Sequence, residues 1–305
     1  MVEHPATLEL CQTLERKGYL VHWIGVDNKG RLDTDAYVKA LNERVAVVSF
    51  MWANNETGTI FPIEKLALAA KRVGAQFHVD AVQVIGKMPI CVDRTGIDML
   101  SLSGHKFHAP KGVGALYLKR GTRFRPLLRG GHQERGRRAG TENAASIIGL
   151  GVAADLAQQA VTEEMGRIAM MRDRLEQGIL SRIPNTFVTG NPRERVPNTS
   201  NIAIEYIEGE AILLLMNQVG IAASSGSACT SGSLEPSHVM KAMDIPFTAA
   251  HGTLRFSLSR FTKDDDIDHV LDQLPAIVER LRALSPYWDN DKQQGAEESF
   301  TPAYA

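Results

Sequence analysis

Met99-Leu100-Ser101-Leu102-Ser103-Gly104-His105-Lys106 is the stretch of the chain that decides the fold. Its first five residues are apolar or small and are typical of a short strand, and a lysine follows soon after the strand ends. A lysine at this position has two interpretations. It is either an ordinary surface lysine, the usual fate of that residue, or an amine placed for chemistry at a strand end.

The segments around this stretch alternate between strand-like and helix-like patterns. Residues 45–50 are apolar and β-branched, as in a strand buried on both faces, and residues 62–73 have the proline start and apolar spacing of a helix. Strand-like runs recur at residues 76–79 and 115–118. The alternation predicts an α/β fold with a mixed, mainly parallel sheet covered by helices. Chemistry in such sheets collects at the carboxyl ends of strands, where the chain carries Asn55, Asp80 and His105-Lys106.

The second half of the chain has a different pattern. Residues 144–159 and 162–180 predict two helices, and a polar loop at 191–198 follows them. Candidate strands lie at 201–204, 221–223 and 253–258, and a capping-box pattern at 262–265 opens a final helix that continues to about residue 284. We therefore expect a large domain over residues 1–160, a smaller α+β domain over 161–284 and a polar tail over 285–305.

Composition excludes several classes of function. The formal net charge of −1 over 305 residues gives no basic field to attract nucleic acid or an anionic membrane. No uninterrupted apolar run is long enough to span a bilayer, and the first residues lack the pattern of a secretory signal. Three scattered cysteines do not make a disulfide framework, and no close spacing suggests a metal site. We expect a cytoplasmic protein without a metal ion.

Lys106 and Asp80 together fit one cofactor, pyridoxal 5′-phosphate. A lysine amine can form a Schiff base with its aldehyde, and a carboxylate can hold the proton of its pyridine ring. Asp80 alone is more simply a turn residue at a strand end, but Gln83 one turn later and Lys106 downstream favour the paired interpretation. The segment Asn54-Asn55-Glu56-Thr57-Gly58 is either a plain turn or a means to place an amide at the cofactor's phenolic oxygen.

Two further residues suggest a use for such a cofactor. Cys229 lies among serines, glycines and a threonine, a poor sequence for a core, so we expect an exposed and mobile nucleophile rather than a small buried hydrophobe. Arg255 alternates with apolar neighbours and needs an anionic partner, which is either an internal acid or a substrate carboxylate gripped by the guanidinium fork. The glycine- and arginine-rich residues 130–143 favour an anion-binding loop over a nucleic-acid site.

In combination these motifs resemble the cysteine desulfurases, class V aminotransferase-like enzymes of pyridoxal phosphate fold type I, and most closely the nitrogen-fixation (NifS-type) branch. The resemblance rests on Trp52-Ala53-Asn54-Asn55-Glu56-Thr57-Gly58-Thr59, His78-Val79-Asp80-Ala81-Val82-Gln83, Ser103-Gly104-His105-Lys106, residues 135–143 and residues 224–235. It extends from His4 to about the end of the last predicted helix.

The resemblance implies a role for each matched position. The implied catalytic residues are Lys106 as the Schiff-base lysine, Cys229 as the carrier of a persulfide, and His4, which stacks on the cofactor ring. Implied cofactor contacts are Asp80 at the pyridine nitrogen, Gln83 and Asn55 near the phenolic oxygen, and Ser103, His105 and Thr141 at the phosphate. Thr141 matches a threonine that reaches the partner subunit of a homodimer, and Arg255 and Asn55 match substrate-binding residues. The implied reaction converts L-cysteine to L-alanine and passes sulfur to an iron–sulfur scaffold protein for nitrogenase cluster assembly.

The chain departs from the family pattern at its start. Family members begin well before His4, and the segment they carry there includes a loop that cradles the cofactor phosphate. We therefore expect an N-terminally truncated large domain that binds the cofactor weakly and has little activity. The alternatives are a related lyase or aminotransferase of the same fold, which would not need Cys229, and an inactive fragment.

Overall fold

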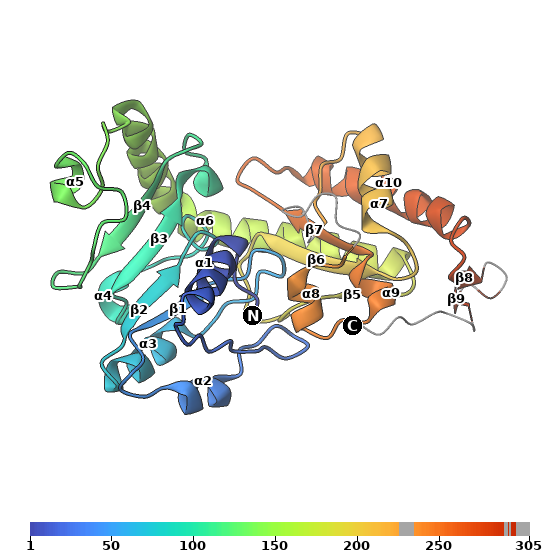
Figure 1. Ribbon diagram of the computed structural model, residues 1–305. Coiled ribbons are helices and arrows are strands. Elements are labelled where there is room, and N and C mark those ends of the chain that lie inside the picture. Colours follow the sequence, from blue (N-terminus) through green and yellow to red (C-terminus); the bar gives the residue numbers. More distant parts are fainter. Residues whose placement is uncertain (226–234, 290–291, 293, 297–305) are drawn as a thin grey trace. The chain divides into compact units, whose positions relative to one another are not determined.

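The computed structural model describes residues 1–225, 235–289, 292 and 294–296 (Figure 1). The chain divides into two compact units, which we describe separately. The sheet unit contains residues 37–53 and 61–163, and the C-terminal unit contains residues 1–36, 54–60 and 164–305. The domain boundary expected at residue 160 stays a prediction.

A four-stranded sheet organises the sheet unit, in the order β1 (Val47–Met51), β2 (Gln76–Asp80), β3 (Met99–Ser103) and β4 (Gly114–Leu118). The first three strands are parallel, and β4 is antiparallel to β3. This confirms the mixed, mainly parallel sheet expected from the sequence. The expected carboxyl edge of three parallel strands is therefore present, and it carries Asp80 and Ser103.

Alternation along β2 decides which side chains enter the core. Phe77 and Val79 are fully buried, whereas His78 and Asp80 alternate with them on the other face of the strand. Helix α3 (Ile63–Arg72) lies against β2 and buries side chains at helical spacing: Ile63, Leu66, Ala67 and Ala70. The neighbouring helices α2 (Thr34–Ala40) and α4 (Val92–Thr95) are short, and α5 (Gln133–Gly136) is a single turn.

The C-terminal unit is built on an antiparallel sheet in the order β5 (Thr186–Val188), β6 (Thr199–Ile204) and β7 (Thr253–Ser257). Every residue of the central strand β6 is buried. Its core also takes side chains from α6 (Ala144–Arg182), α7 (Gly209–Gln218) and α10 (Asp264–Arg282). The remaining elements are α1 (Pro5–Arg16), α8 (His238–Ala242), α9 (Phe247–Ala250) and the pair β8 (Trp288–Asp289) and β9 (Gln294–Gly295).

Two element predictions are wrong. The two helices expected at 144–159 and 162–180 are one continuous helix, α6, because the residues between them include no glycine or proline to break it. The strand expected at 221–223 is absent from the described structure there, and only an isolated bridge joins Ser224 to Arg255. The final helix begins at Asp264, and the Lys263 N–H donates to Asp266 Oδ2, so the cap lies one residue later than expected.

The first part of α6, Ala144–Glu163, is long and apolar enough to cross a membrane by length and composition, with a mean hydropathy of 1.3. A single helix of this kind is weak evidence for a membrane span, because helices of water-soluble folds meet the same criteria. Its exposed apolar side chains include Ile147, Ile148, Val152 and Leu156.

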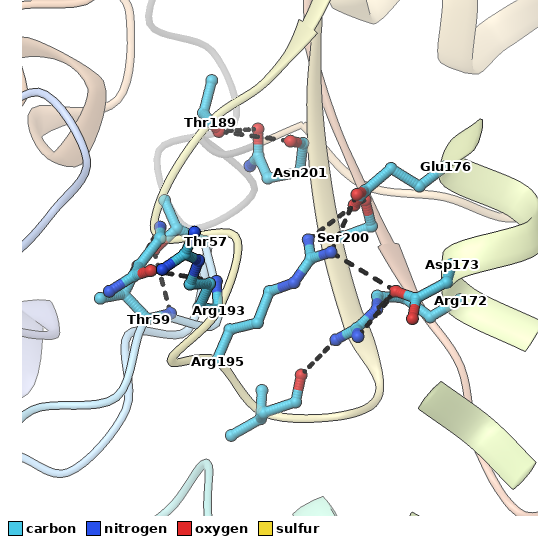
Figure 2. Close-up of polar contacts among 12 residues, drawn as sticks. Thr57, Thr59, Arg172, Asp173, Glu176, Thr189, Arg193, Arg195, Ser200 and Asn201 are labelled. Carbon is cyan, nitrogen blue, oxygen red and sulfur yellow. Dashed lines mark hydrogen bonds and ion pairs between the residues drawn. The ribbon is translucent and has the colours of Figure 1, made fainter. Parts of the chain in front are cut away.

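A buried ion pair fixes the second part of α6 to the strands of the C-terminal unit (Figure 2). Arg195 donates two hydrogen bonds to the carboxylate of Glu176, at 2.6 and 2.8 Å, and Ser200 Oγ donates a third at 2.7 Å. Arg172 beside them donates to Asp173 and to the Val196 carbonyl. The guanidinium forks match the carboxylates in shape, so the pair sets the position of the helix.

Candidate active site

The carboxyl edge of the parallel strands positions the first group of expected site residues, all within the sheet unit. Met51, Asp80 and Ser101 are register partners across β1, β2 and β3. Ser103 is the last residue of β3, and Lys106 lies three residues beyond it. Parallel strands end at one edge of a sheet, so the topology brings Asp80, Ser103 and Lys106 to the same edge.

Asp80 and Gln83 lie on the turn that leaves β2. One carboxylate oxygen of Asp80, Oδ1, accepts a hydrogen bond from the Val82 N–H at 2.9 Å, which fixes the carboxyl group at the strand end. Gln83 Oε1 accepts from Lys87 Nζ at 2.7 Å. The expected phenolic-oxygen contact of Gln83 stays a prediction, and its amide nitrogen is the group suited to donate there.

A 3₁₀ turn, η1 (Gly104–Phe107), carries Lys106 and ends at His108, whose φ of 72° is left-handed. The Ser103 hydroxyl and His105 Nδ1 lie 3.0 Å apart, so the two residues expected at the phosphate form one polar pair. Lys106 is exposed on this turn. A Cβ at Gly104 would lie 2.9 Å from Leu150 Cδ1 and 3.0 Å from Ala109 Cβ, which explains why the turn begins with glycine.

The sequence did not single out His78, whose ring joins three strands. Its Nδ1 lies 2.8 Å from Ser49 Oγ on β1, and its Nε2 lies 2.8 Å from Ser101 Oγ on β3. Burial lowers the pKa of His78, although the charge of Asp80 raises it in part. A neutral imidazole between two hydroxyls therefore supports the face of β2 that carries Asp80. The sequence alone carried no signal for this role, because both partners of His78 lie on other strands.

Asn55 and Arg255 belong to the C-terminal unit and contact each other there. The Asn54 side chain accepts hydrogen bonds from the backbone N–H groups of Glu56 and Thr57, at 2.9 Å each, and so shapes the turn that presents Asn55. Arg255 Nη1 donates to the Asn55 carbonyl at 2.8 Å. Asn55 Oδ1 and Arg255 Nε are buried without a hydrogen-bond partner among the described residues. An amide oxygen and a guanidinium N–H in this condition suit a polar ligand.

Three expected residues lie elsewhere or are not described. His4 is half-buried at the N-terminus of α1, where its Nδ1 accepts from the Ala6 N–H at 3.2 Å and caps the helix. Thr141 is exposed between α5 and α6. Cys229 lies outside the described residues. The roles expected for these three residues stay predictions.

Comparison with known proteins gives a consistent result. The family model "Aminotransferase class-V" matches residues 1–270. The chain is 65% identical over 305 residues to "Cysteine desulfurase NifS" of Azotobacter vinelandii. This match covers all of this chain and 76% of that protein. It is 63% identical to "Cysteine desulfurase" of Gluconacetobacter diazotrophicus, again over 100% of this chain and 76% of the relative.

Solved structures agree with the sequence relatives. A protein titled "NIFS-LIKE PROTEIN" superposes with a TM-score of 0.85 at 33% identity, over 92% of this chain and 74% of the other. A second, titled "SspA in complex with cysteine", has a TM-score of 0.70 at 31% identity, over 86% of this chain and 73% of the other.

Proposed function

The chain belongs to the cysteine desulfurases of the aminotransferase class-V family, and from this membership we propose that it converts L-cysteine to L-alanine and leaves the sulfur as a persulfide on Cys229. The observation that carries the proposal is the common sheet edge of Asp80, Ser103 and Lys106. This edge carries an acid, a hydroxyl and an amine, and the carboxyl ends of parallel strands are where open α/β sheets bind ligands.

Relatives of this family are pyridoxal phosphate enzymes, and the residues of this chain fit that cofactor. Lys106 would hold it covalently, Asp80 would keep a proton at its ring nitrogen, and the Ser103–His105 pair with Thr141 would bind its phosphate. His4, Gln83 and Asn55 would contact the ring and its phenolic oxygen. When bound, the cofactor supplies an electron sink for the bonds of the substrate's α-carbon.

Residues of the chain would perform the remaining steps. Arg255, with its Nε–H available, binds the substrate carboxylate and orients the amino acid, with Asn55 beside it. The Lys106 amine takes and returns the proton at the α-carbon. The Cys229 thiolate attacks the substrate sulfur, so a sulfur–sulfur bond forms as the carbon–sulfur bond breaks. The electron pair of the broken bond stays with the β-carbon, which takes a proton and becomes the methyl group of L-alanine.

The partners of the chain are part of the same proposal. The exposed apolar side chains Ile148 and Val152 on α6 support a homodimer, in which Thr141 reaches the other subunit's phosphate. The "NifS" in a relative's name supports delivery of sulfur to an iron–sulfur scaffold for nitrogenase. We place this transfer in the cytoplasm.

The test is to incubate the purified chain with pyridoxal phosphate, L-cysteine and a thiol reductant. We expect sulfide and L-alanine in equal amounts, formed at a low rate, and labelled sulfur on Cys229 when the reductant is omitted. Cys229→Ser should keep the cofactor but lose both products, whereas Cys11→Ser and Cys91→Ser are matched controls that should behave as the unmodified chain. Full sulfide release by Cys229→Ser would instead favour a lyase that needs no thiol.

A further inference from the structure

Glu56 is a buried carboxyl group that the mechanism above does not use. Its side chain is 2% exposed, and both carboxyl oxygens lie within reach of one hydroxyl, Ser237 Oγ, at 2.7 and 2.6 Å. Ser237 caps helix α8, and its Oγ also accepts from the Val239 N–H at 3.0 Å. A single hydroxyl proton cannot satisfy two carboxylate oxygens, so the described residues compensate Glu56 poorly as an anion.

Among the described residues, the charged group that acts on Glu56 is Arg255. Arg255 Nη1 is bonded to the carbonyl of Asn55, the residue directly before Glu56. Burial raises the pKa of Glu56 to about 7, although the Ser237 hydrogen bond and the Arg255 charge both lower it. His238, which follows Ser237 on α8, adds no charge at neutral pH because burial lowers its pKa. The Asn201 side chain on β6 is uncharged, and its Nδ2 donates to the backbone carbonyl of Glu56 rather than to the carboxyl group.

We propose that Glu56 is a positioning residue for Arg255, a buried counter-charge that takes up a proton when the substrate carboxylate binds the guanidinium. Without an anion, Arg255 favours the ionised form of Glu56. A bound carboxylate neutralises the field of Arg255, and ionised Glu56 then loses the stabilisation that this charge gives it in a buried site. Arg255 cannot itself lose a proton, so the change in protonation falls on Glu56.

The linkage has a definite sign. Substrate binding favours protonated Glu56, so affinity is highest below the pKa of about 7 and falls as rising pH ionises the carboxyl group. If binding makes this pKa about one unit higher, affinity falls roughly fivefold between about pH 6 and about pH 8, and binding near pH 7 takes up roughly 0.4 proton per site.

The inference rests on the proposed function, because it takes Arg255 as the carboxylate-binding group. The test is calorimetric binding of L-alanine, the proposed product, to the cofactor-loaded chain near pH 7 in two buffers of different ionisation enthalpy. The difference between buffers gives the protons taken up, and this readout does not depend on turnover. Glu56→Gln keeps the shape and removes the titration, and Glu9→Gln on the exposed face of α1 is the matched control.

We expect Glu9→Gln to take up as many protons as the unmodified chain and Glu56→Gln to take up roughly 0.4 fewer. Ser237→Ala removes a hydrogen bond that lowers the pKa of Glu56, so the pH of greatest uptake should move upward. Equal uptake by Glu56→Gln and the unmodified chain overturns the role of Glu56. Affinity for L-alanine that Arg255→Lys leaves unchanged overturns the assignment of Arg255, and the inference with it.

Discussion

Replacing Glu176 by glutamine should destabilise the C-terminal unit strongly. The Arg195 and Glu176 side chains are 5% and 12% exposed, and the change leaves the Arg195 cation without its bidentate partner. Removing one member of a buried ion pair costs about 3–5 kcal/mol. Asp173, 3.5 Å from Arg195 and 47% exposed, remains as a weaker acid partner, which favours the lower end of the range. We expect a loss of about 3 kcal/mol, or a melting temperature roughly 6–12 °C lower.

The assay is guanidinium and thermal unfolding of Glu176→Gln beside Asp272→Asn. Asp272 pairs with Arg182 at 3.5 Å, and the two side chains are 69% and 47% exposed, so its loss should cost at most about 0.5 kcal/mol. Measuring the free energy of unfolding of both variants as a function of pH adds a second check. Burial acts to raise the pKa of Glu176, but the hydrogen bonds from Arg195 and Ser200 and the nearby arginine charges hold it below its ordinary value.

A lowered carboxyl pKa contributes stability above the unfolded-state pKa, and that contribution is lost as pH falls through the folded-state pKa. The difference between the unmodified chain and Glu176→Gln should therefore be full at neutral pH and shrink below about pH 4. A Glu176→Gln variant as stable as Asp272→Asn at neutral pH would refute the reasoning, because the Arg195 charge would then be satisfied without Glu176.

Three further changes test the sheet edge. Lys106→Ala should abolish the borohydride-trapped cofactor adduct while Lys111→Ala keeps it, and peptide mapping of an adduct elsewhere would contradict the assignment of Lys106. Gly104→Ala should cost about 1–3 kcal/mol in denaturant unfolding, because its Cβ would lie 2.9 Å from Leu150 Cδ1, whereas Gly166→Ala on the exposed surface of α6 should be neutral or stabilising. The lowered pKa of His78 means that its neutral form stabilises the fold above about pH 6.5 and that this stability declines as pH falls; His78→Gln should flatten that decline in an acid titration.

The sequence was sufficient for the strands of the main sheet and for the group at its carboxyl edge. Buried strands carry their signal in a few consecutive residues, and β1, β2 and β3 lie where such runs occur. A polar residue at the end of an apolar run is also a local pattern. Asp80 at the end of β2 and Lys106 just after β3 could therefore both be predicted as site residues. The two predicted helices left only Ala160 and Val161 between them, and neither residue breaks a helix, so the continuity of α6 could have been predicted from the sequence.

The supports of the site could not be found in this way. The hydrogen-bond partner of Glu56 is Ser237, which lies 181 residues further along the chain. The partner of Asn55 is Arg255, which lies 200 residues away. His78 looks like an alternating strand residue until its partners on two other strands are known. Tertiary contacts of this range leave no local pattern in one sequence.

These distant contacts also constrain how the protein is made. The C-terminal unit is assembled from three separate pieces of chain, and the turn at Asn54 receives its Arg255 partner only when β7 has left the ribosome. Synthesis proceeds at about 5–20 residues per second, so the early pieces wait for roughly 10–40 s. During that time the strand edge that carries Lys106 is synthesised, but Arg255 on β7 is not. The early pieces of the C-terminal unit therefore stay without their later strand partners for that time, and a chaperone that shields them should raise the yield of folded protein.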